Sequence, residues 1–169
     1  MRDESKDKTR YEQFSKLSTE LDKWPEDRVK TLLKERLEKE LWAIIKIAMG
    51  TEQGKDLEAT KNSKAIHIEA KGEPKSISSY RQERRQFVGG ALISLITHMT
   101  QEDENIAYCM AFPDNDYYLR GVLTRIPSLV RKKLRVFGLF LREDSSIQVL
   151  YPSNNNTEEL RSFDDLFHG

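Results

Sequence analysis

The sequence predicts an α/β protein in which helices cover a mixed β-sheet, and its hydrophobic periodicity is the reason. Apolar residues recur every three or four positions over 25–49 and again over 78–99, which indicates two amphipathic helices. Between them, 56–71 carries two strand-like runs on either side of a polar turn, a pattern typical of a β-hairpin. The expected order is helix, strand, strand, helix, strand, helix, strand, strand, in which the later elements occupy 106–112, 118–133, 135–141 and 147–151.

The first helix is expected to run from Pro25 to Met49. Pro25 suits the first helical turn, and Glu26 and Asp27 follow it near the positive end of the helix dipole. Gly50 would then terminate the helix. An apolar stripe along this helix must pack on another element, and the hairpin is the obvious partner. The stripe consists of Val29, Leu33, Leu37, Leu41, Ile44, Ile45 and Ala48.

Two later helices each contain residues that oppose helix formation. Ser78 or Ser79 would cap the helix over 78–99, but Gly89-Gly90 costs about 1 kcal/mol per residue in helix propensity unless close packing compensates. We therefore expect a neighbour to approach closely at these two glycines. In the segment 118–133, Pro127 predicts a break and a fresh helical start.

Length and composition suit one domain of ordinary size. With 169 residues, of which 37% are hydrophobic and 33% are charged, the chain can bury an adequate core. We expect a polar N-terminal segment at 1–24 with a short helix from about Tyr11, a folded domain at 25–152, and a polar tail at 153–169. Lys plus Arg and Asp plus Glu both number 28, so a nucleic-acid surface would have to be a local basic patch.

Cysteine usage and the absence of long apolar runs indicate a cytoplasmic protein. Cys109 is the only cysteine, so the chain cannot form an intramolecular disulfide, and we expect the thiol to be a small buried core side chain. The N-terminal residues are too polar for a signal peptide, and no apolar run approaches the ~18 residues that span a membrane.

The hairpin carries the most informative side chains. If residues 62–63 form a two-residue turn, Asp56 faces Glu69 across the two strands. The period of two then places Glu69 and Lys71 on one face, so that an ammonium group stands beside two carboxylates. Such a group is suited to hold a hard cation such as Mg²⁺ and to stabilise a phosphate. The alternative is an ordinary cross-strand ion pair on an exposed strand, and a slip of one residue in the turn would separate Asp56 from Glu69.

Asp56, Glu69 and Lys71 form the pattern Asp-x12-Glu-x-Lys, with Gly72 directly after the lysine, and this pattern resembles the PD-(D/E)XK nuclease signature. The resemblance covers about 26–152 and implies the restriction-endonuclease-like fold, an α/β sandwich with a mixed central sheet flanked by helices. It also implies hydrolysis of phosphodiester bonds in DNA. In that case Asp56, Glu69 and Ala70 would bind Mg²⁺ or Mn²⁺, and Lys71 would position or activate the attacking water. The family's usual extra strand before the acid is not evident in this sequence.

The resemblance also suggests helper residues on the neighbouring helices. Relatives often add a glutamate from the preceding helix, for which Glu38 is preferred over Glu35, and solvent-facing helix charges are the equally plain alternative. A glutamine from the following helix would be Gln82, although Gln86 lies on the same helix face. Gly90 stands where many relatives place a glutamine, which leaves that role unassigned.

A basic surface is expected beside the hairpin. Lys75 precedes the following helix, and Arg81, Arg84 and Arg85 open it, so these four side chains are candidates for phosphate contacts with DNA. Such contacts position a nucleic acid without reading its sequence, and no dedicated base-reading motif appears. Cleavage of both strands would favour a homodimer with two active sites.

Two other functions remain open from the sequence. The chain could be a catalytically silent member of the nuclease fold that binds nucleic acid or a protein partner in a defence or repair assembly. The neutral net charge and Gly90 favour that alternative, whereas the intact Asp56, Glu69 and Lys71 favour an enzyme. A different hairpin register would instead leave an interaction domain without a metal site.

Overall fold

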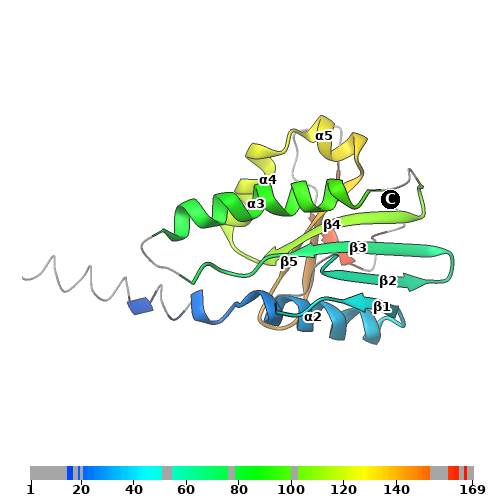
Figure 1. Cartoon of the computed structure of the whole chain (residues 1–169), viewed down its shortest axis with the longest axis horizontal. Helices are drawn as coiled ribbons and strands as arrows, with labels where there is room; N and C mark the ends of the chain where they lie inside the picture. The colour runs from blue at the N-terminus through cyan, green and yellow to red at the C-terminus, as the bar shows by residue number, and fades with distance from the viewer. Residues whose placement is uncertain are drawn as a thin grey trace, which may run out of the picture.

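The structure, a computed structural model, describes residues 21–50, 55–75, 79–99, 103–152 and 160–163, together with the single positions 15, 16, 19 and 166. In this part of the chain the fold is α/β, with a seven-stranded mixed sheet flanked by helices (Figure 1). The elements are α2 (Glu26–Lys39), β1 (Ala43–Ile47), β2 (Leu57–Lys61), β3 (Lys64–Ala70), α3 (Tyr80–Thr97), β4 (Ile106–Pro113), α4 (Asp116–Arg125), α5 (Ser128–Lys133), β5 (Val136–Leu141), β6 (Ile147–Leu150) and β7 (Leu160–Ser162).

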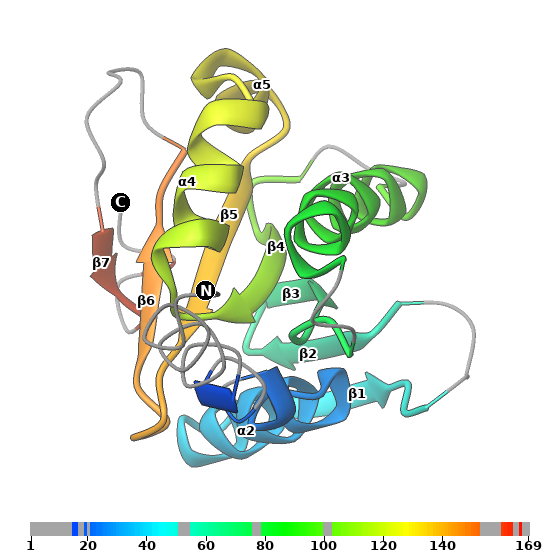
Figure 2. The same cartoon turned by 90° about the vertical axis from the view of Figure 1, so that its left-hand side faces the viewer.

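The strands lie in the sheet in their sequence order, β1 to β7. The central pairs β3–β4 and β4–β5 are parallel, and the outer pairs are antiparallel. The two parallel pairs need crossover connections, which α3 supplies for the first and α4 with α5 supplies for the second. Figure 2 shows the resulting layers, with α2 on one face of the sheet and α3, α4 and α5 on the other.

Each face of the sheet has its own hydrophobic core. Side chains of β4 alternate between the two cores, so that Cys109 packs on the α2 side while Met110 and Phe112 pack on the side of α3 and α4. Every residue of β4 is buried, which explains why its sequence is a continuous apolar run. No helix in the described ranges is both long and apolar enough to cross a membrane.

The expectation of one helix from Pro25 to Met49 is wrong. Helix α2 ends at Lys39, and the following residues form β1, which pairs antiparallel with β2. The chain leaves the helix through a Schellman motif, in which Leu41 has a left-handed φ of 65° and Trp42 N–H donates to Leu37 O at 2.9 Å. A leucine rather than the usual glycine occupies the left-handed position, so the stop signal is hidden in the sequence. Three isoleucines then favour a strand, and β1 covers the outer edge of the hairpin.

The other expected elements are confirmed with small shifts of their ends. Helix α3 and strands β4, β5 and β6 form where the periodicity places them, and Pro127 separates α4 from α5 as expected. The expected close packing at Gly89-Gly90 is wrong, because a Cβ at either position would meet nothing within 4 Å among the described residues.

The two ends of the chain are described only in part. The polar tail expected at 153–169 contains β7, which pairs with β6, and Phe163 and Leu166 are buried in the core on the α2 side. The first ten residues lie outside the described residues, and so does most of the short helix expected from Tyr11.

Candidate functional site

The hairpin between β2 and β3 has the expected register. Leu57 pairs with Ile68 and Lys61 with Lys64, and Asn62 begins the turn with a left-handed φ of 57°. Asp56 directly precedes β2, so this register brings it level with Glu69 near the end of β3. The predicted register of the hairpin is therefore confirmed, and Asp56 lies one position beyond its last pair, on the side of Glu69.

Asp56 is 6% exposed, and both of its carboxylate oxygens have partners. Oδ2 accepts a hydrogen bond of 2.8 Å from the backbone N–H of Ala70 and lies 3.7 Å from Lys71 Nζ. Oδ1 lies 2.9 Å from Nζ of Lys30 in helix α2. The acid and the lysine of the predicted motif are therefore in contact, and a second lysine that the sequence analysis did not identify joins them.

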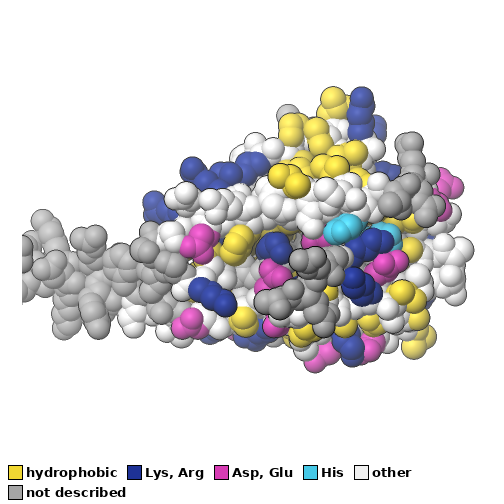
Figure 3. Space-filling model, in the orientation of Figure 1, with side chains coloured by type: hydrophobic (Ala, Val, Ile, Leu, Met, Phe, Trp, Pro, Cys, Tyr) yellow, Lys and Arg dark blue, Asp and Glu magenta, His cyan; other side chains and the backbone are white. Residues whose placement is uncertain are grey.

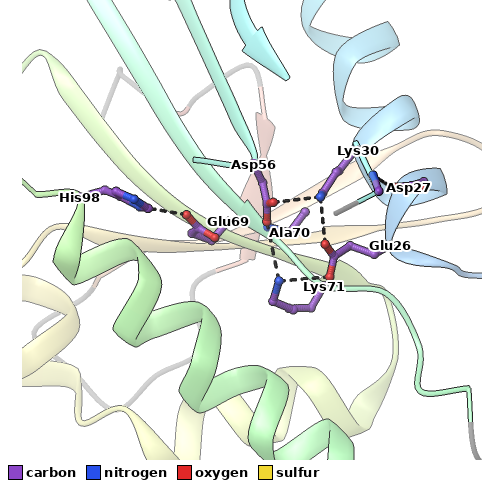
Figure 4. Close-up of polar contacts among 9 residues, drawn as sticks. Glu26, Asp27, Lys30, Asp56, Glu69, Ala70, Lys71 and His98 are labelled. Atoms are coloured by element: carbon purple, nitrogen blue, oxygen red, sulfur yellow. Dashed lines mark hydrogen bonds and ion pairs between the residues drawn. The ribbon is translucent and has the colours of Figure 1, made fainter. Parts of the chain in front are cut away.

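Glu26 connects the two lysines. Its Oε1 lies 2.9 Å from Lys30 Nζ, and its Oε2 lies 3.1 Å from Lys71 Nζ. Asp56, Lys30, Glu26 and Lys71 thus form a closed cycle of alternating charges, which we call the lysine–carboxylate ring (Figure 4). Alternation allows these four charges to lie close together, since each group has an oppositely charged group on both sides.

Lys30 is held as a buried cation, with only 2% of the residue exposed. Burial by itself lowers the pKa of Lys30, but hydrogen bonds to Glu26 and Asp56 and the charges of both carboxylates outweigh it, so the pKa lies above its ordinary value. The side chain therefore stays protonated at neutral pH. The sequence does indicate that Lys30 faces inward, because it precedes Leu33 and Leu37 at helical spacing on the buried face of α2.

Glu69 is outside the ring and faces α3. It is 3% exposed, and its Oε1 lies 3.2 Å from Nδ1 of His98. Burial and the negative charge of Asp56 raise the pKa of Glu69, while a hydrogen bond with the Ser94 side chain and the charges of Lys71 and His98 oppose the rise. The two carboxylates therefore repel each other. Ser94 and His98, one turn apart on α3, were missed because only the crossover geometry brings them to β3.

Gly72 brings the start of α2 to the end of β3. A Cβ at Gly72 would lie 2.4 Å from Glu26 N and 2.4 Å from Trp24 O, distances that no side chain tolerates. The backbone N–H of Glu73 also donates to Trp24 O at 2.6 Å. This backbone contact places the first turns of α2, which carry Glu26 and Lys30, beside Lys71.

The structure does not bring the predicted helper residues Glu38 and Gln82 to Asp56. Glu38 pairs with Lys34, one turn away on the exposed side of α2, and lies about 18 Å along the helix axis from Glu26. Gln82 is exposed in the first turn of α3, about 18 Å along that axis from Ser94. The helix acid next to the predicted lysine is therefore Glu26.

The four predicted phosphate-contacting residues divide into two groups. The side chain of Arg84 is 12% exposed and forms a bidentate pair with Glu73, with Nη2–Oε1 at 2.8 Å and Nε–Oε2 at 2.6 Å. Its guanidinium also lies over the rings of Tyr80, Tyr117 and Tyr118, so the charged group of Arg84 already makes its contacts within the fold. The exposed residues of the four are Lys75, Arg81 and Arg85.

The exposed basic residues and a pocket lie near the ring. Lysine and arginine side chains gather over the N-terminal half of α3, where Arg81 and Arg85 are exposed (Figure 3). Lys75 lines a pocket of about 470 Å³ in which the other charged lining residues are acidic: Glu26, Asp27, Glu73 and Glu83. The exposed ammonium of Lys75 therefore lies in a largely acidic pocket at the edge of the ring.

The donor set at Asp56 and Glu69 is compatible with Mg²⁺. Magnesium is commonly held by one or two carboxylates and keeps several waters, and a dication would offset the burial and the negative charge of Asp56 that raise the pKa of Glu69. Between the two acids, Ala70 already donates its N–H to Asp56. Within the described ranges, no cluster of three or more His, Cys, Asp or Glu side chains is arranged as a metal site.

In comparisons with known proteins, no family model, curated protein or solved structure matches this chain. The geometry of the site is therefore the basis for a function. That geometry consists of two buried carboxylates on one hairpin, a lysine in contact with the first of them, and a second lysine from α2 that completes the ring.

Proposed function

We propose that this protein is a metal-dependent nuclease of the PD-(D/E)XK type with the restriction-endonuclease-like fold, and that it hydrolyses phosphodiester bonds in DNA. One observation carries the proposal: Asp56 and Glu69 are buried side by side on one hairpin, and Lys71 contacts Asp56 at 3.7 Å. Burial and the negative charge of Asp56 raise the pKa of Glu69, and a carboxylate kept in such a costly position is typical of functional sites.

The arrangement of the elements supports the same proposal. A helix, three antiparallel strands, a helix and a parallel strand follow one another in α2, β1, β2, β3, α3 and β4. Strand β1 is in the place of the strand that the family resemblance requires before the acid. Asp56 directly precedes β2, Glu69 is near the end of β3 and Lys71 directly follows that strand, an arrangement that supports the resemblance.

The residues of the site have distinct chemical tasks in this proposal. Asp56 and Glu69 would hold Mg²⁺, which when bound supplies charge neutralisation at the scissile phosphate and lowers the pKa of a bound water. Lys71 is partly exposed, so its ammonium can donate hydrogen bonds to a phosphate oxygen or to the attacking water. Glu26 orients Lys71 through its 3.1 Å contact.

Cleavage of supercoiled, linear and single-stranded DNA with Mg²⁺ or Mn²⁺ tests the proposal. We expect cutting that EDTA abolishes and that falls by at least about 100-fold in Asp56→Asn, Glu69→Gln and Lys71→Met, the scale seen when a catalytic charge is removed. Glu58→Gln is the matched control, because Glu58 is on the same hairpin but pairs with Lys55 and His67. Cutting that survives all three site substitutions would contradict the proposal.

A catalytically silent DNA-binding module is the second candidate, and Lys30 favours it. The ammonium of Lys30 neutralises Asp56 from within the fold, so the acid does not need a metal to be stable. Calorimetric titration separates the two candidates. If the wild type binds DNA but takes up neither Mg²⁺ nor Mn²⁺ at millimolar concentrations, the silent module is the correct function.

A homodimer would place two active sites on the two strands of a duplex. Light scattering at increasing protein concentration, with and without a DNA duplex, measures this directly. A mass that stays at that of one chain of 19.7 kDa in every condition would contradict a dimer.

A further inference from the structure

The proposed nuclease chemistry assigns no task to Lys30. Lys71 already supplies a positive charge to Asp56, at 3.7 Å from Oδ2, and Lys71 is the more exposed of the two lysines. Lys30 is almost completely buried and contacts the other oxygen, Oδ1, at 2.9 Å. A buried ammonium needs excellent partners to offset its desolvation, and here it has two carboxylates.

We propose that Lys30 is the internal counter-cation of the candidate site, and that a divalent cation binds by displacing the Lys30 ammonium from Asp56. This inference rests on the proposed metal-dependent function and adds to it how the metal-free site is held. Lys30 is thus a positioning residue: it holds Asp56 ready in the absence of metal, and it competes with the metal for the same carboxylate.

Occupancy of the Asp56 oxygens is the first argument. The N–H of Ala70 and the ammonium of Lys71 approach Oδ2, while the ammonium of Lys30 contacts Oδ1. Each carboxylate oxygen has two lone pairs, so Lys30 occupies one acceptor position of Oδ1, and a cation that takes this position replaces Lys30. The Ala70 bond belongs to the backbone of β3, and Lys71 is needed at the reaction centre, so Lys30 is the donor that can leave.

Charge is the second argument. Asp56, Glu69 and Glu26 carry three negative charges, and Lys30 and Lys71 carry two positive charges. The net charge of these five side chains is therefore −1. Adding a dication brings the group to +1 and places it next to the Lys30 ammonium in a buried setting, where repulsion is strong. Movement of Lys30 away from Asp56 relieves that repulsion.

The helix provides a place for the displaced ammonium. Glu26 and Lys30 are one turn apart on α2 and already in contact at 2.9 Å. Lys30 can therefore leave Asp56 and remain paired with Glu26, which is partly exposed. The exchange needs a side-chain rotation and no movement of the fold.

Mn²⁺ binding to the full chain, followed by electron paramagnetic resonance, tests the inference with Lys30→Met. Methionine keeps the length of the side chain and removes its charge, so we expect Mn²⁺ to bind about ten-fold more tightly or better, the scale of a close charge pair. Lys34→Met is the matched control, because Lys34 is one turn along the same helix and pairs with Glu38 on the surface. It should bind Mn²⁺ like the wild type.

A second measurement uses the wild type and does not depend on the folding of a variant. The buried Lys30 ammonium should give a protected ¹H–¹⁵N signal in the metal-free protein, and saturation with Mg²⁺ should shift or remove it. An unchanged Lys30 signal in protein that has bound Mg²⁺ would overturn the inference.

The outcomes separate this inference from the proposed function. If the wild type and Lys30→Met bind Mn²⁺ equally well, the counter-cation role is wrong while the metal-dependent nuclease stands. If neither protein binds Mn²⁺ and the wild type does not cut DNA, both proposals are wrong. If only Lys30→Met binds Mn²⁺, Lys30 blocks the site permanently, and the wild type is the silent module.

Discussion

Replacing Gly72 with alanine tests how the candidate site is assembled. The added Cβ would lie 2.4 Å from Glu26 N, 2.4 Å from Trp24 O and 2.6 Å from Pro25 C. Carbon atoms pack best at separations of about 3.5–4.0 Å, so the start of α2 or the end of β3 must move by about 1 Å. All three atoms are in the backbone, and no side-chain rotation can relieve the clash.

The expected loss of stability follows from three contributions. Overpacking costs about 1–3 kcal/mol, and weakening of the Glu73 N–H bond to Trp24 O at the same contact costs about 1 kcal/mol more. Reduced freedom of the unfolded chain returns about 0.4–1 kcal/mol when alanine replaces glycine. The free energy of unfolding of Gly72→Ala should therefore fall by about 2 kcal/mol.

Urea denaturation followed by circular dichroism measures this change. Gly89→Ala is the matched control, since a Cβ there meets nothing within 4 Å and the position is exposed in helix α3. The free energy of unfolding of that variant should rise by about 1 kcal/mol, because alanine has a higher helix propensity than glycine. If Gly72→Ala unfolds within about 0.5 kcal/mol of the wild type, the contact at Gly72 does not hold α2 in place and the reasoning is refuted.

Four further predictions concern single side chains. The Cys109 thiol is fully buried, and burial raises its pKa, so iodoacetamide should modify it only in urea, as mass spectrometry would show; rapid modification of the native protein would contradict its burial. Arg84→Ala should lower the free energy of unfolding by about 3 kcal/mol, because it leaves the buried Glu73 carboxylate without its cationic partner. The exposed neighbour variant Arg85→Ala should stay within about 0.5 kcal/mol of the wild type and weaken the proposed DNA binding instead. Glu69→Gln should raise the melting temperature in EDTA, with a gain on the order of 1 kcal/mol, because it removes a buried charge that repels Asp56; a lower melting temperature would show that the charge stabilises the fold. Leu41→Gly should raise the free energy of unfolding, measured by denaturant titration, by about 0.5–1 kcal/mol, since Leu41 is 82% exposed with a φ of 65°. A lower free energy of unfolding would contradict strain at that residue.

Local patterns were sufficient to predict the hairpin and the acids on it. A two-residue turn fixes the register of its own strands, so the pairing that brings Asp56 level with Glu69 follows from residues only a few positions apart. The same holds for α3 and β4, whose periodicity reflects burial on one face or on both.

The end of the first helix could not be predicted in this way. The apolar residues that follow Lys39 fit a helical stripe as well as a strand, and the decision between them lies in pairing with β2. Leu41 in a left-handed conformation gives no sequence signal, because its cost is offset by tertiary contacts that the helix end and β1 make together.

The sequence by itself determined the class of fold, the hairpin and the motif Asp56, Glu69 and Lys71, because these depend on short-range spacing. Only the tertiary structure decided the partners of these residues. The backbone contact at Gly72 brings Glu26 and Lys30 to the site, and the bidentate pair with Glu73 withdraws Arg84 from the surface. These contacts join segments far apart in the chain, and their energies depend on burial and on charges that no local pattern records.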